Sequence, residues 1–428
     1  MFDKYKIGNL ILFESDNTPD FEPFNIMHPI WEMRIGAFRI FEKYLKIFDN
    51  PNIYYKGRED QSNSFIKRFN YKKEDFTKKN TLIIDASILP SGDFFDSLFD
   101  TYSEFIENLP NKTVQFTKDG KPFGVYIPAE EVFNPNPNEF EFLLKFMTDF
   151  GGVVPKIELD DAPRLNYLWD TLDTVSNQIN EDFAYFNENH ISEFENTRHL
   201  AFINSKKIYI GKNVKISPFV VIDASEGDVI ISDNVKIMPH STLTGPLFIG
   251  QNTIIKTGAK IYEKTAIGEF CKIGGEIENT IIQSYSNKQH EGFLGHSFIC
   301  EWVNLGADTN NSDLKNTYGN IKMRLSHKTV DSKRMFLGLI CGDHTKSAIN
   351  TQFNTGTIAG ICGVLFDSGF LKTNISSFAW GGGLSAKTYL IENAIETAKI
   401  VLSRRNKELT EEELKIITHE YNKVTKQI

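Results

Sequence analysis

The segment from Tyr285 to Lys315 gathers polar side chains of the types that acyl transfer requires. Transfer of an acetyl group to an amine needs a base poised near neutral pH, and imidazole is the side chain whose ordinary pKa lies there. The tetrahedral intermediate also needs hydrogen-bond donors aimed at its oxyanion. We predict that His290 is the base, and that the Asn304 side-chain amide and a backbone N–H near Ala307 are the donors.

Two carboxylates in the same segment, Glu291 and Asp313, are candidates to orient the imidazole of His290. His296 is the weaker candidate for the base. The alternative is that His290 is a satisfied polar residue in a turn of a scaffold. Lys288 and other polar residues stand close to His290 in the sequence, and this crowding favours the functional interpretation.

The element that must position these residues is a repeat with a period of six. Most members of its aliphatic column are followed four positions later by a small or β-branched residue. This period fits neither an α-helix nor an isolated strand, but it is that of a parallel β-helix built from hexapeptides. The alternative is that the column serves only as a structural spacer. Its eight continuous members are Ile231, Ile237, Leu243, Ile249, Ile255, Ile261, Ile267 and Ile273, and Ile210, Ile216 and Ile222 keep the same spacing ahead of a three-residue slip.

Residues 1–200 lack the repeat and form the first predicted domain. Short apolar runs alternate there with helical stretches, which indicates a mostly parallel α/β sheet. The predicted helices are residues 35–48, 94–108 and 165–186.

Residues 201–380 form the predicted β-helix, and a non-repeating insertion at residues 308–334 interrupts it. Long external loops on such a solenoid often build binding sites. Residues 381–428 are predicted as terminal helices, and Thr410 followed by Glu413 is typical of a capping box. These helices are residues 387–405 and 411–427.

Composition and charge limit the classes of partner. The formal net charge of -9 argues against a nucleic-acid partner, because phosphate binding depends on concentrated Lys and Arg. The four cysteines are widely separated and form no C-x-x-C pair, which favours reduced thiols. The sequence shows neither a signal-peptide core nor a membrane-length apolar stretch. We therefore expect a cytoplasmic protein with no membrane partner.

Three motifs, His290, Leu294-Gly295 and Asn304-Leu-Gly-Ala307, resemble the bifunctional glucosamine-1-phosphate acetyltransferase/N-acetylglucosamine-1-phosphate uridylyltransferase family. The resemblance implies a left-handed parallel β-helix, acetyl-CoA as the acyl donor, and a homotrimer with the ligand site between neighbouring prisms. Substrate-binding residues predicted on this basis are Lys288, Phe293, Asp313 and Lys315.

Two departures leave the acyl acceptor open. Phe293 stands where this family has a tyrosine that helps to hold the sugar. Glu278 and Asn279 stand where it has a basic pair that grips the sugar phosphate. Glu276 adds a second carboxylate where a phosphate would need cations. The resemblance therefore does not identify an amino-sugar phosphate as the acceptor.

A glycine-rich segment in the later coils is the predicted site for acetyl-CoA. Gly356 and Gly360 would let a pantetheine arm approach the backbone. Lys372 and Lys387 are the predicted partners of the phosphates of acetyl-CoA. The alternative is that these glycines only turn the corners of the prism.

The N-terminal domain lacks the expected nucleotide loop, since residues 13–20 contain neither glycine nor arginine. The run from His28 to Gly36, a Pro followed by Glu-x-Arg-x-Gly, resembles a divergent group of sugar nucleotidyltransferases. That resemblance implies a Rossmann-like nucleotidyltransferase domain in which Arg34 contacts phosphate and Asp85 holds Mg²⁺. The alternatives are that Arg34 pairs with Glu32 or Asp85, and that Asp85 caps a helix or turn.

These observations predict a transferase of nucleotide-sugar metabolism. Its first half would act on a sugar 1-phosphate and a nucleoside triphosphate with Mg²⁺, and its second half would use acetyl-CoA with His290 as base. The alternative is a non-catalytic sugar-nucleotide binding or regulatory protein with a degenerate nucleotidyltransferase domain.

Overall fold

The computed structural model describes residues 6–71, 76–107, 109, 112–132, 154–194 and 197–426. The chain divides into two compact units, each described by itself below. The α/β unit contains residues 1–18, 28–32 and 38–166, and the β-helix unit contains residues 19–27, 33–37 and 167–428. These units differ from the predicted boundary at residue 200, because helix α6 (Thr171–Phe183) packs on strands of the β-helix.

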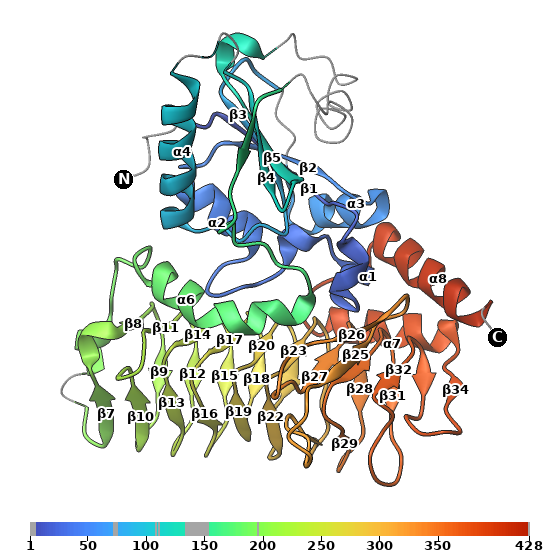
Figure 1. The fold of residues 1–428 in the computed structure, drawn as a ribbon. Helices are drawn as coiled ribbons and strands as arrows, with labels where there is room; N and C mark the ends of the chain where they lie inside the picture. Colours follow the sequence, from blue (N-terminus) through green and yellow to red (C-terminus); the bar gives the residue numbers. More distant parts are fainter. Residues whose placement is uncertain are drawn as a thin grey trace. The chain divides into compact units, whose positions relative to one another are not determined.

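The α/β unit is built on one six-stranded sheet in the order β2-β1-β3-β5-β4-β6 (Figure 1). Strands β1, β2 and β3 run parallel, as do β4 and β6, whereas β5 runs antiparallel to both β3 and β4. Five of the six strands therefore run in one direction and β5 alone is reversed, so the sheet is mixed but mostly parallel, as predicted. The strands are β1 (Asn9–Phe13), β2 (Asn52–Lys56), β3 (Thr81–Asp85), β4 (Val114–Lys118), β5 (Lys121–Ile127) and β6 (Lys156–Glu158).

A tight turn explains the antiparallel strands. Asp119 and Gly120 join β4 to β5, and both have positive φ, 51° and 70°. Two consecutive residues of positive φ form the hairpin turn whose twist matches that of antiparallel strands. An Asp-Gly pair between two apolar runs is a sequence signal for this turn, and the turn accounts for the one reversed strand, β5.

The helices of this unit agree only in part with the predictions. Helix α2 begins at residue 40 rather than 35, and α4 packs against β5 through Phe99 and Tyr126. Asn108, the predicted end of α4, lies outside the described residues. The helices are α2 (Ile40–Ile47), α3 (Glu59–Arg68) and α4 (Gly92–Ile106), with 3-10 turns η2 (Ile30–Glu32) and η3 (Ala129–Glu131).

The β-helix unit is a stack of coils whose strands form three long parallel sheets (Figure 1). The first sheet contains β7 (Leu200–Ile203), β10 (Val220–Asp223), β13 (Thr242–Thr244), β16 (Lys260–Ile261), β19 (Glu276–Glu278) and β22 (Phe293–Gly295). The second contains β8 (Ile208–Ile210), β11 (Val229–Ile231), β14 (Leu247–Ile249), β17 (Thr265–Ile267), β20 (Ile281–Ile282), β23 (Phe298–Ile299), β27 (Leu339–Cys341), β30 (Thr357–Ala359) and β32 (Asn374–Ile375). The third contains β9 (Lys215–Ile216), β12 (Lys236–Ile237), β15 (Ile254–Ile255), β18 (Lys272–Ile273) and β21 (Asn287–Lys288).

The later coils are less regular than the first ones. Strands β24 (Asn310–Asn311) and β29 (Gln352–Phe353) pair with each other, and β28 (Lys346–Ser347), β31 (Val364–Leu365), β33 (Ala379–Trp380) and β34 (Lys387–Thr388) form a further sheet. The insertion folds in part into an antiparallel hairpin, β25 (Lys322–Arg324) with β26 (Thr329–Asp331).

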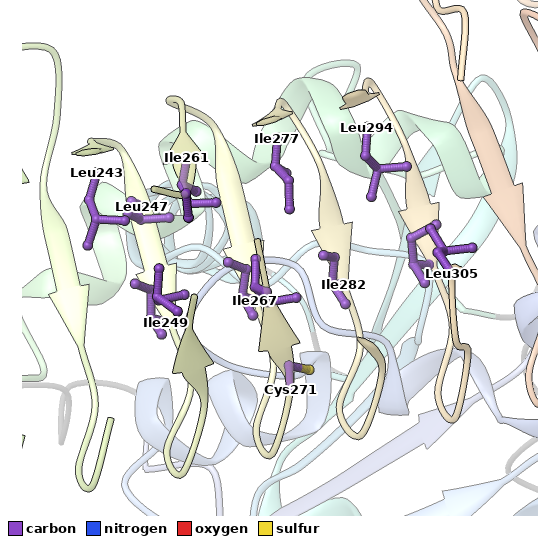
Figure 2. Close-up of a cluster of buried hydrophobic side chains, with 14 of the residues drawn as sticks. Leu243, Leu247, Ile249, Ile261, Ile267, Cys271, Ile277, Ile282, Leu294 and Leu305 are labelled. Carbon is purple, nitrogen blue, oxygen red and sulfur yellow. The ribbon is translucent and has the colours of Figure 1, made fainter. Parts of the chain in front are cut away.

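The aliphatic column forms the core of the β-helix, as predicted. Leu243, Ile261, Ile277 and Leu294 follow one another in register across the first sheet and point inward (Figure 2). All eight predicted column residues are 0% exposed. Full burial of such a side chain contributes about 1.5–3 kcal/mol. The predicted parallel β-helix is confirmed, and its left-handed sense stays a prediction.

Two C-terminal helices cover aromatic residues at one corner of the later coils. On α7 (Ile391–Ser403), Ala398 and Leu402 pack against Trp302. On α8 (Glu411–Thr425), Ile416 and Ile417 pack near Phe378. The predicted capping box is confirmed, with a 3.1 Å hydrogen bond from the Glu413 N–H to Thr410 Oγ1. Gln427, the predicted end of α8, lies outside the described residues.

Candidate functional site

His290 lies in the turn between β21 and β22 and is exposed. In the part of the β-helix unit that the structure describes, its imidazole has no hydrogen-bond partner. The adjacent carboxylate of Glu291 forms an ion pair with Lys260 at 3.5 Å rather than with His290. Neither of the two predicted orienting carboxylates therefore contacts His290 in this structure. The imidazole remains accessible to a substrate on the outer surface of the coil.

Lys288, predicted to bind substrate, lies in the interior of the coil rather than on its surface. Its side chain points inward, pairs in register with the column residue Ile273, and is 2% exposed. The ammonium donates to the carbonyl oxygens of His290, at 2.5 Å, and Glu291, at 2.8 Å. Burial lowers the pKa of Lys288 to about 8, against the opposing effect of the nearby carboxylates Glu291 and Asp308. The lysine thus holds the turn of His290 from inside.

The predicted oxyanion donors lie in the next coil. Asn304 forms parallel bridges with Asn287 of the preceding coil and Lys346 of the following one, and is half-buried. Ala307 precedes Asp308, whose N–H donates to the Glu291 carbonyl at 3.1 Å. That hydrogen bond joins the two turns directly. The fold therefore brings the coil of Asn304 and Ala307 against the coil of His290.

His296 has the carboxylate partner that His290 lacks. Its Nδ1 lies 2.8 Å from Asp313 Oδ2, and both side chains are largely buried, at 18% and 15% exposure. The ring of Phe336, two residues after the insertion, stacks on the imidazole with centroids 5.2 Å apart. Asp313 thus orients the weaker candidate base. Phe336 was missed by the sequence analysis because it belongs to a segment without a repeat.

The outward side of the first sheet carries the remaining predicted substrate residues. Glu276 pairs in register with Lys260 on one side and with Phe293 on the other, and all three face outward. Glu278 pairs with Gly295, above which the ring of Phe293 and the Asp313 carboxylate fill the space that a Cβ would need. The surface next to β22 is therefore partly acidic and partly aromatic.

Side-chain amides replace the backbone ladder next to β22. Asn310 Oδ1 accepts from the Phe293 N–H at 2.8 Å, and Asn311 Oδ1 accepts from the Gly295 N–H at 2.9 Å. Strand β24, which carries both asparagines, pairs with β29 instead of joining the sheet of β22. Lys315, in the insertion, donates to the carbonyl oxygen of Asn320 at 2.5 Å and has no contact with the other predicted site residues in the described segments.

The predicted acetyl-CoA glycines support the alternative interpretation. A Cβ on Gly356 would lie 2.5 Å from Ile321 Cγ2, and one on Gly360 would lie 2.4 Å from the Ser377 nitrogen. The space beside each glycine is thus filled by another residue of the β-helix unit, which leaves no room for a pantetheine arm on that side. Lys372 and Lys387 are exposed and accessible to phosphate.

Arg34 is a structural residue, contrary to the prediction. It belongs to the β-helix unit, is 0% exposed, and donates to Glu269 Oε1 and the Ala37 carbonyl, both at 2.5 Å. Its guanidinium lies 5.0 Å from the centroid of the Phe248 ring. The alternative of an ion pair was right in kind but wrong in partner, since neither Glu32 nor Asp85 is involved. No surface of Arg34 remains for a phosphate.

Asp85 is also closed off. Its Oδ2 lies 2.7 Å from both Arg164 and Ser15 Oγ, and its Oδ1 accepts from the Ser87 N–H at 2.8 Å, the turn cap named as the alternative. Asp85 is 0% exposed. Within the described ranges, no group of three or more His, Cys, Asp or Glu residues could hold a metal ion. These residues do not fit Mg²⁺ at Asp85.

A second ion pair fills the same edge of the sheet. Glu14 directly follows β1, and its carboxylate accepts from the Arg58 guanidinium at 2.9 Å and from the Ile30 N–H at 3.0 Å. In α/β sheets, ligands bind at the carboxyl ends of the parallel strands. At the ends of β1, β2 and β3 the chain instead places Glu14, Arg58 and Asp85, each paired with another residue of the α/β unit.

The remaining charged residue of the Glu-x-Arg motif is also paired. Glu32 is 2% exposed, and Arg68 contacts its carboxylate at 2.5 Å. Although burial acts in the opposite direction, Arg68 and His28 together hold the pKa of Glu32 well below its usual range. The motif that suggested phosphate binding therefore consists of buried ion pairs.

Comparisons with known proteins agree with the predicted resemblance. Residues 10–191 match the family model described as sugar nucleotidyl transferase. The bifunctional sugar-1-phosphate nucleotidylyltransferase/acetyltransferase of Sulfurisphaera tokodaii is 28% identical over 148 residues, which are 35% of each chain. The bifunctional protein GlmU of Methanococcus aeolicus is 31% identical over 153 residues, again 35% of each chain. The solved Arabidopsis UDP-N-acetylglucosamine acyltransferase is 14% identical, with 49% of this chain and 79% of that chain covered and a TM-score of 0.25.

The matched segments span about a third of the length of these curated relatives, 35% in both cases. No helix among the described residues is long and apolar enough to cross a membrane. The chain is thus similar to sugar nucleotidyl transferases over residues 10–191 and, over about a third of its length, to bifunctional nucleotidylyltransferase/acetyltransferases.

Proposed function

We propose that this protein is a transferase of sugar-nucleotide metabolism whose β-helix unit transfers an acyl group from acetyl-CoA to an amine. The observation that carries this proposal is the exposed imidazole of His290 on a turn held from inside by Lys288 and joined to the coil of Asn304 and Ala307. The similarity to bifunctional nucleotidylyltransferase/acetyltransferases supports the same reaction class. We further propose a cytoplasmic homotrimer.

In the proposed reaction, the acceptor nitrogen attacks the thioester carbonyl of acetyl-CoA and the new C–N bond forms. His290 takes the proton that the nitrogen loses, and the C–S bond then breaks to release CoA. The Asn304 amide and the Ala307 N–H donate to the oxyanion of the intermediate. A base of this kind contributes about 10² to 10⁴ in rate.

The outer face of β19 suggests what the acceptor carries. Glu276 and Glu278 are half-buried there, next to Phe293. Carboxylates repel a phosphate and attract an ammonium group. We therefore propose that the acceptor presents an amine and a sugar ring to this face, without a phosphate beside Glu276 and Glu278.

The reaction is tested by measuring free thiol from acetyl-CoA in the presence of amino sugars, each with and without a 1-phosphate. The proposal expects acceptor-dependent thiol release, with the unphosphorylated amino sugar at least as good as its 1-phosphate. Absence of thiol release with every acceptor would refute acyl transfer. Preference for the 1-phosphate would refute the assignment of the acidic face.

The α/β unit favours the second candidate function, sugar-nucleotide binding without turnover. Nucleotidyl transfer proceeds by in-line attack of a sugar 1-phosphate on the triphosphate, with Mg²⁺ neutralising charge. The ion pairs Asp85–Arg164 and Glu14–Arg58 occupy the strand ends where those groups would bind. We propose that this unit, despite its similarity to sugar nucleotidyl transferases, does not hold Mg²⁺ at Asp85.

Two assays distinguish binding from nucleotidyl transfer. Pyrophosphate release is measured with each nucleoside triphosphate, Mg²⁺ and a panel of sugar 1-phosphates, and binding of UDP-N-acetylglucosamine is measured by calorimetry. We expect no pyrophosphate. Pyrophosphate release that is lost in Asp85→Asn would show that the Asp85–Arg164 pair opens and that Asp85 is catalytic.

A further inference from the structure

The interior of the β-helix contains one feature that a scaffold does not require. On the third sheet, the inward positions of β9, β12, β15 and β18 are all isoleucine, and the next position in register is Lys288. A buried ammonium loses its hydration and is unfavourable unless hydrogen bonds replace it. An aliphatic residue would complete the column without that cost.

The side-chain hydrogen bonds of Lys288 both go to one turn. Its Nζ donates to the carbonyl oxygens of His290 and Glu291, the two residues at the tip of the turn. The Glu291 carbonyl also accepts from the Asp308 N–H at 3.1 Å. The backbone that carries the His290 imidazole is therefore fixed from the interior and from the next coil.

The preceding coil is shaped to admit this arrangement. Gly275 has a φ of +78°, and a Cβ there would lie 2.8 Å from the His290 carbonyl oxygen, 2.7 Å from that of Gly292 and 3.1 Å from Lys288 Nζ. Only glycine fits both the backbone conformation and the space. Lys288 in one coil and Gly275 in the preceding coil therefore both accommodate the turn that carries His290.

We propose that Lys288 is a positioning residue that holds His290 in the orientation needed for acyl transfer. This inference rests on the proposed function of His290. It assigns Lys288 no contact with substrate. Its ammonium instead fixes two carbonyl groups of the turn, which limits the orientations that the His290 imidazole can adopt. The entropic cost of orienting the base is therefore met during folding, before the substrate binds.

The test compares Lys288→Met with Lys236→Met. Methionine has a similar volume and suits an apolar interior, so the variant should fold. Lys236 occupies the exposed, outward position of β12 in the same sheet. With acetyl-CoA and glucosamine as probes, Lys288→Met should lower kcat by about 10- to 100-fold with little change in KM for acetyl-CoA, as expected for lost orientation of a base. Lys236→Met should keep the wild-type kcat.

The pH profile provides a readout that a purely structural lysine would not change. Because the pKa of Lys288 is lowered to about 8, the wild-type kcat should fall as pH rises through that value. The charged groups around it are Glu291 and Asp308, which favour the ammonium, and Lys260, which disfavours it. Lys288→Met should lack this alkaline limb. An unchanged kcat and an unchanged limb in a folded Lys288→Met would overturn the proposal.

Amide hydrogen exchange separates failure of this inference from failure of the proposed function. Peptides covering residues 286–294 should exchange at least about 10-fold faster in Lys288→Met than in wild type or Lys236→Met, because the turn loses its anchor. Unchanged exchange overturns the positioning role even if acyl transfer is confirmed. If the wild type releases no thiol, the proposed function fails, and exchange still decides whether Lys288 holds the turn.

Discussion

Two cations, the half-buried Arg164 and the buried Lys288, show how differently the two units use charge. Arg164, in the α/β unit, lies 2.7 Å from the carboxylate of Asp85 and is neutralised by it. Lys288, in the β-helix unit, is hydrogen-bonded to two peptide carbonyls, which carry no formal charge. The first arrangement occupies the carboxylate that would hold Mg²⁺ at the end of β3. The second leaves the outer surface of its turn free, with His290 exposed. The comparison suggests a closed site in one unit and an open one in the other.

The largest effect is expected from breaking the neutralised pair. Asp85→Ala leaves the Arg164 guanidinium without its carboxylate, and the free energy of unfolding should fall by about 3–5 kcal/mol. Urea denaturation measures this change. The double variant Asp85→Leu with Arg164→Met should recover most of the loss, since replacing both charges removes the uncompensated one. A loss below about 1 kcal/mol in Asp85→Ala would mean that the pair is not a closed structural element.

The next effect comes from the column in which Lys288 stands. Ile273 is its register partner and is 0% exposed, so Ile273→Ala should lower the free energy of unfolding by about 2–5 kcal/mol. Lys288→Met should be neutral or stabilising at pH 7 by the same measurement. If Lys288→Met destabilised as much as Ile273→Ala, the lysine would be a structural member of the column, and the contrast with Arg164 would be lost.

A smaller effect, with a definite sign, follows from the pKa of Lys288. The folded pKa of about 8 lies below the ordinary 10.5, so the unfolded chain binds more protons between these values. The contribution of this group to stability should therefore increase with pH from about 8 to about 10.5, by about 3 kcal/mol in all and by about 2 kcal/mol up to pH 9.5. The difference in unfolding free energy between wild type and Lys288→Met, measured at pH 7 and pH 9.5, isolates it. A difference that does not change with pH would contradict the lowered pKa.

The smallest effect is expected at the surface. Lys260 is 41% exposed and pairs with Glu291 at 3.5 Å. Such pairs contribute about 0.2–1 kcal/mol and are screened by salt. Lys260→Met should change the free energy of unfolding by less than about 1 kcal/mol in the same urea assay. A larger loss would show that the outer ion pair, and not Lys288, holds the turn.

The β-helix could be predicted from the sequence because its period is unlike that of any helix or single strand. The place where that period fails is harder to interpret. Ile273 follows its register partner Ile255 by 18 residues, but Lys288 follows Ile273 by only 15. The shortened coil moves Lys288 into the inward position, so a residue that resembled a surface ligand is part of the interior. A one-residue difference in register reverses the direction of a side chain.

Partners distant in the sequence account for the other corrections. Arg34 pairs with Glu269, which is 235 residues away, and neither the motif nor the spacing indicates that contact. Asp313 was predicted as a candidate to orient His290, but its partner in the structure is His296. The two histidines are only six residues apart, and the sequence separation from Asp313 does not decide between them. Only the path of the insertion, which returns at Phe336 to stack on His296, distinguishes them.

The central claim is that His290, and not the carboxylate-paired His296, is the base. The most direct test measures acceptor-dependent thiol release from acetyl-CoA by folded His290→Gln and His296→Gln variants, side by side with wild type. We predict that His290→Gln lowers kcat by about 10² to 10⁴, whereas His296→Gln retains kcat within about 10-fold. A wild-type rate in His290→Gln together with loss of activity in His296→Gln would contradict the account.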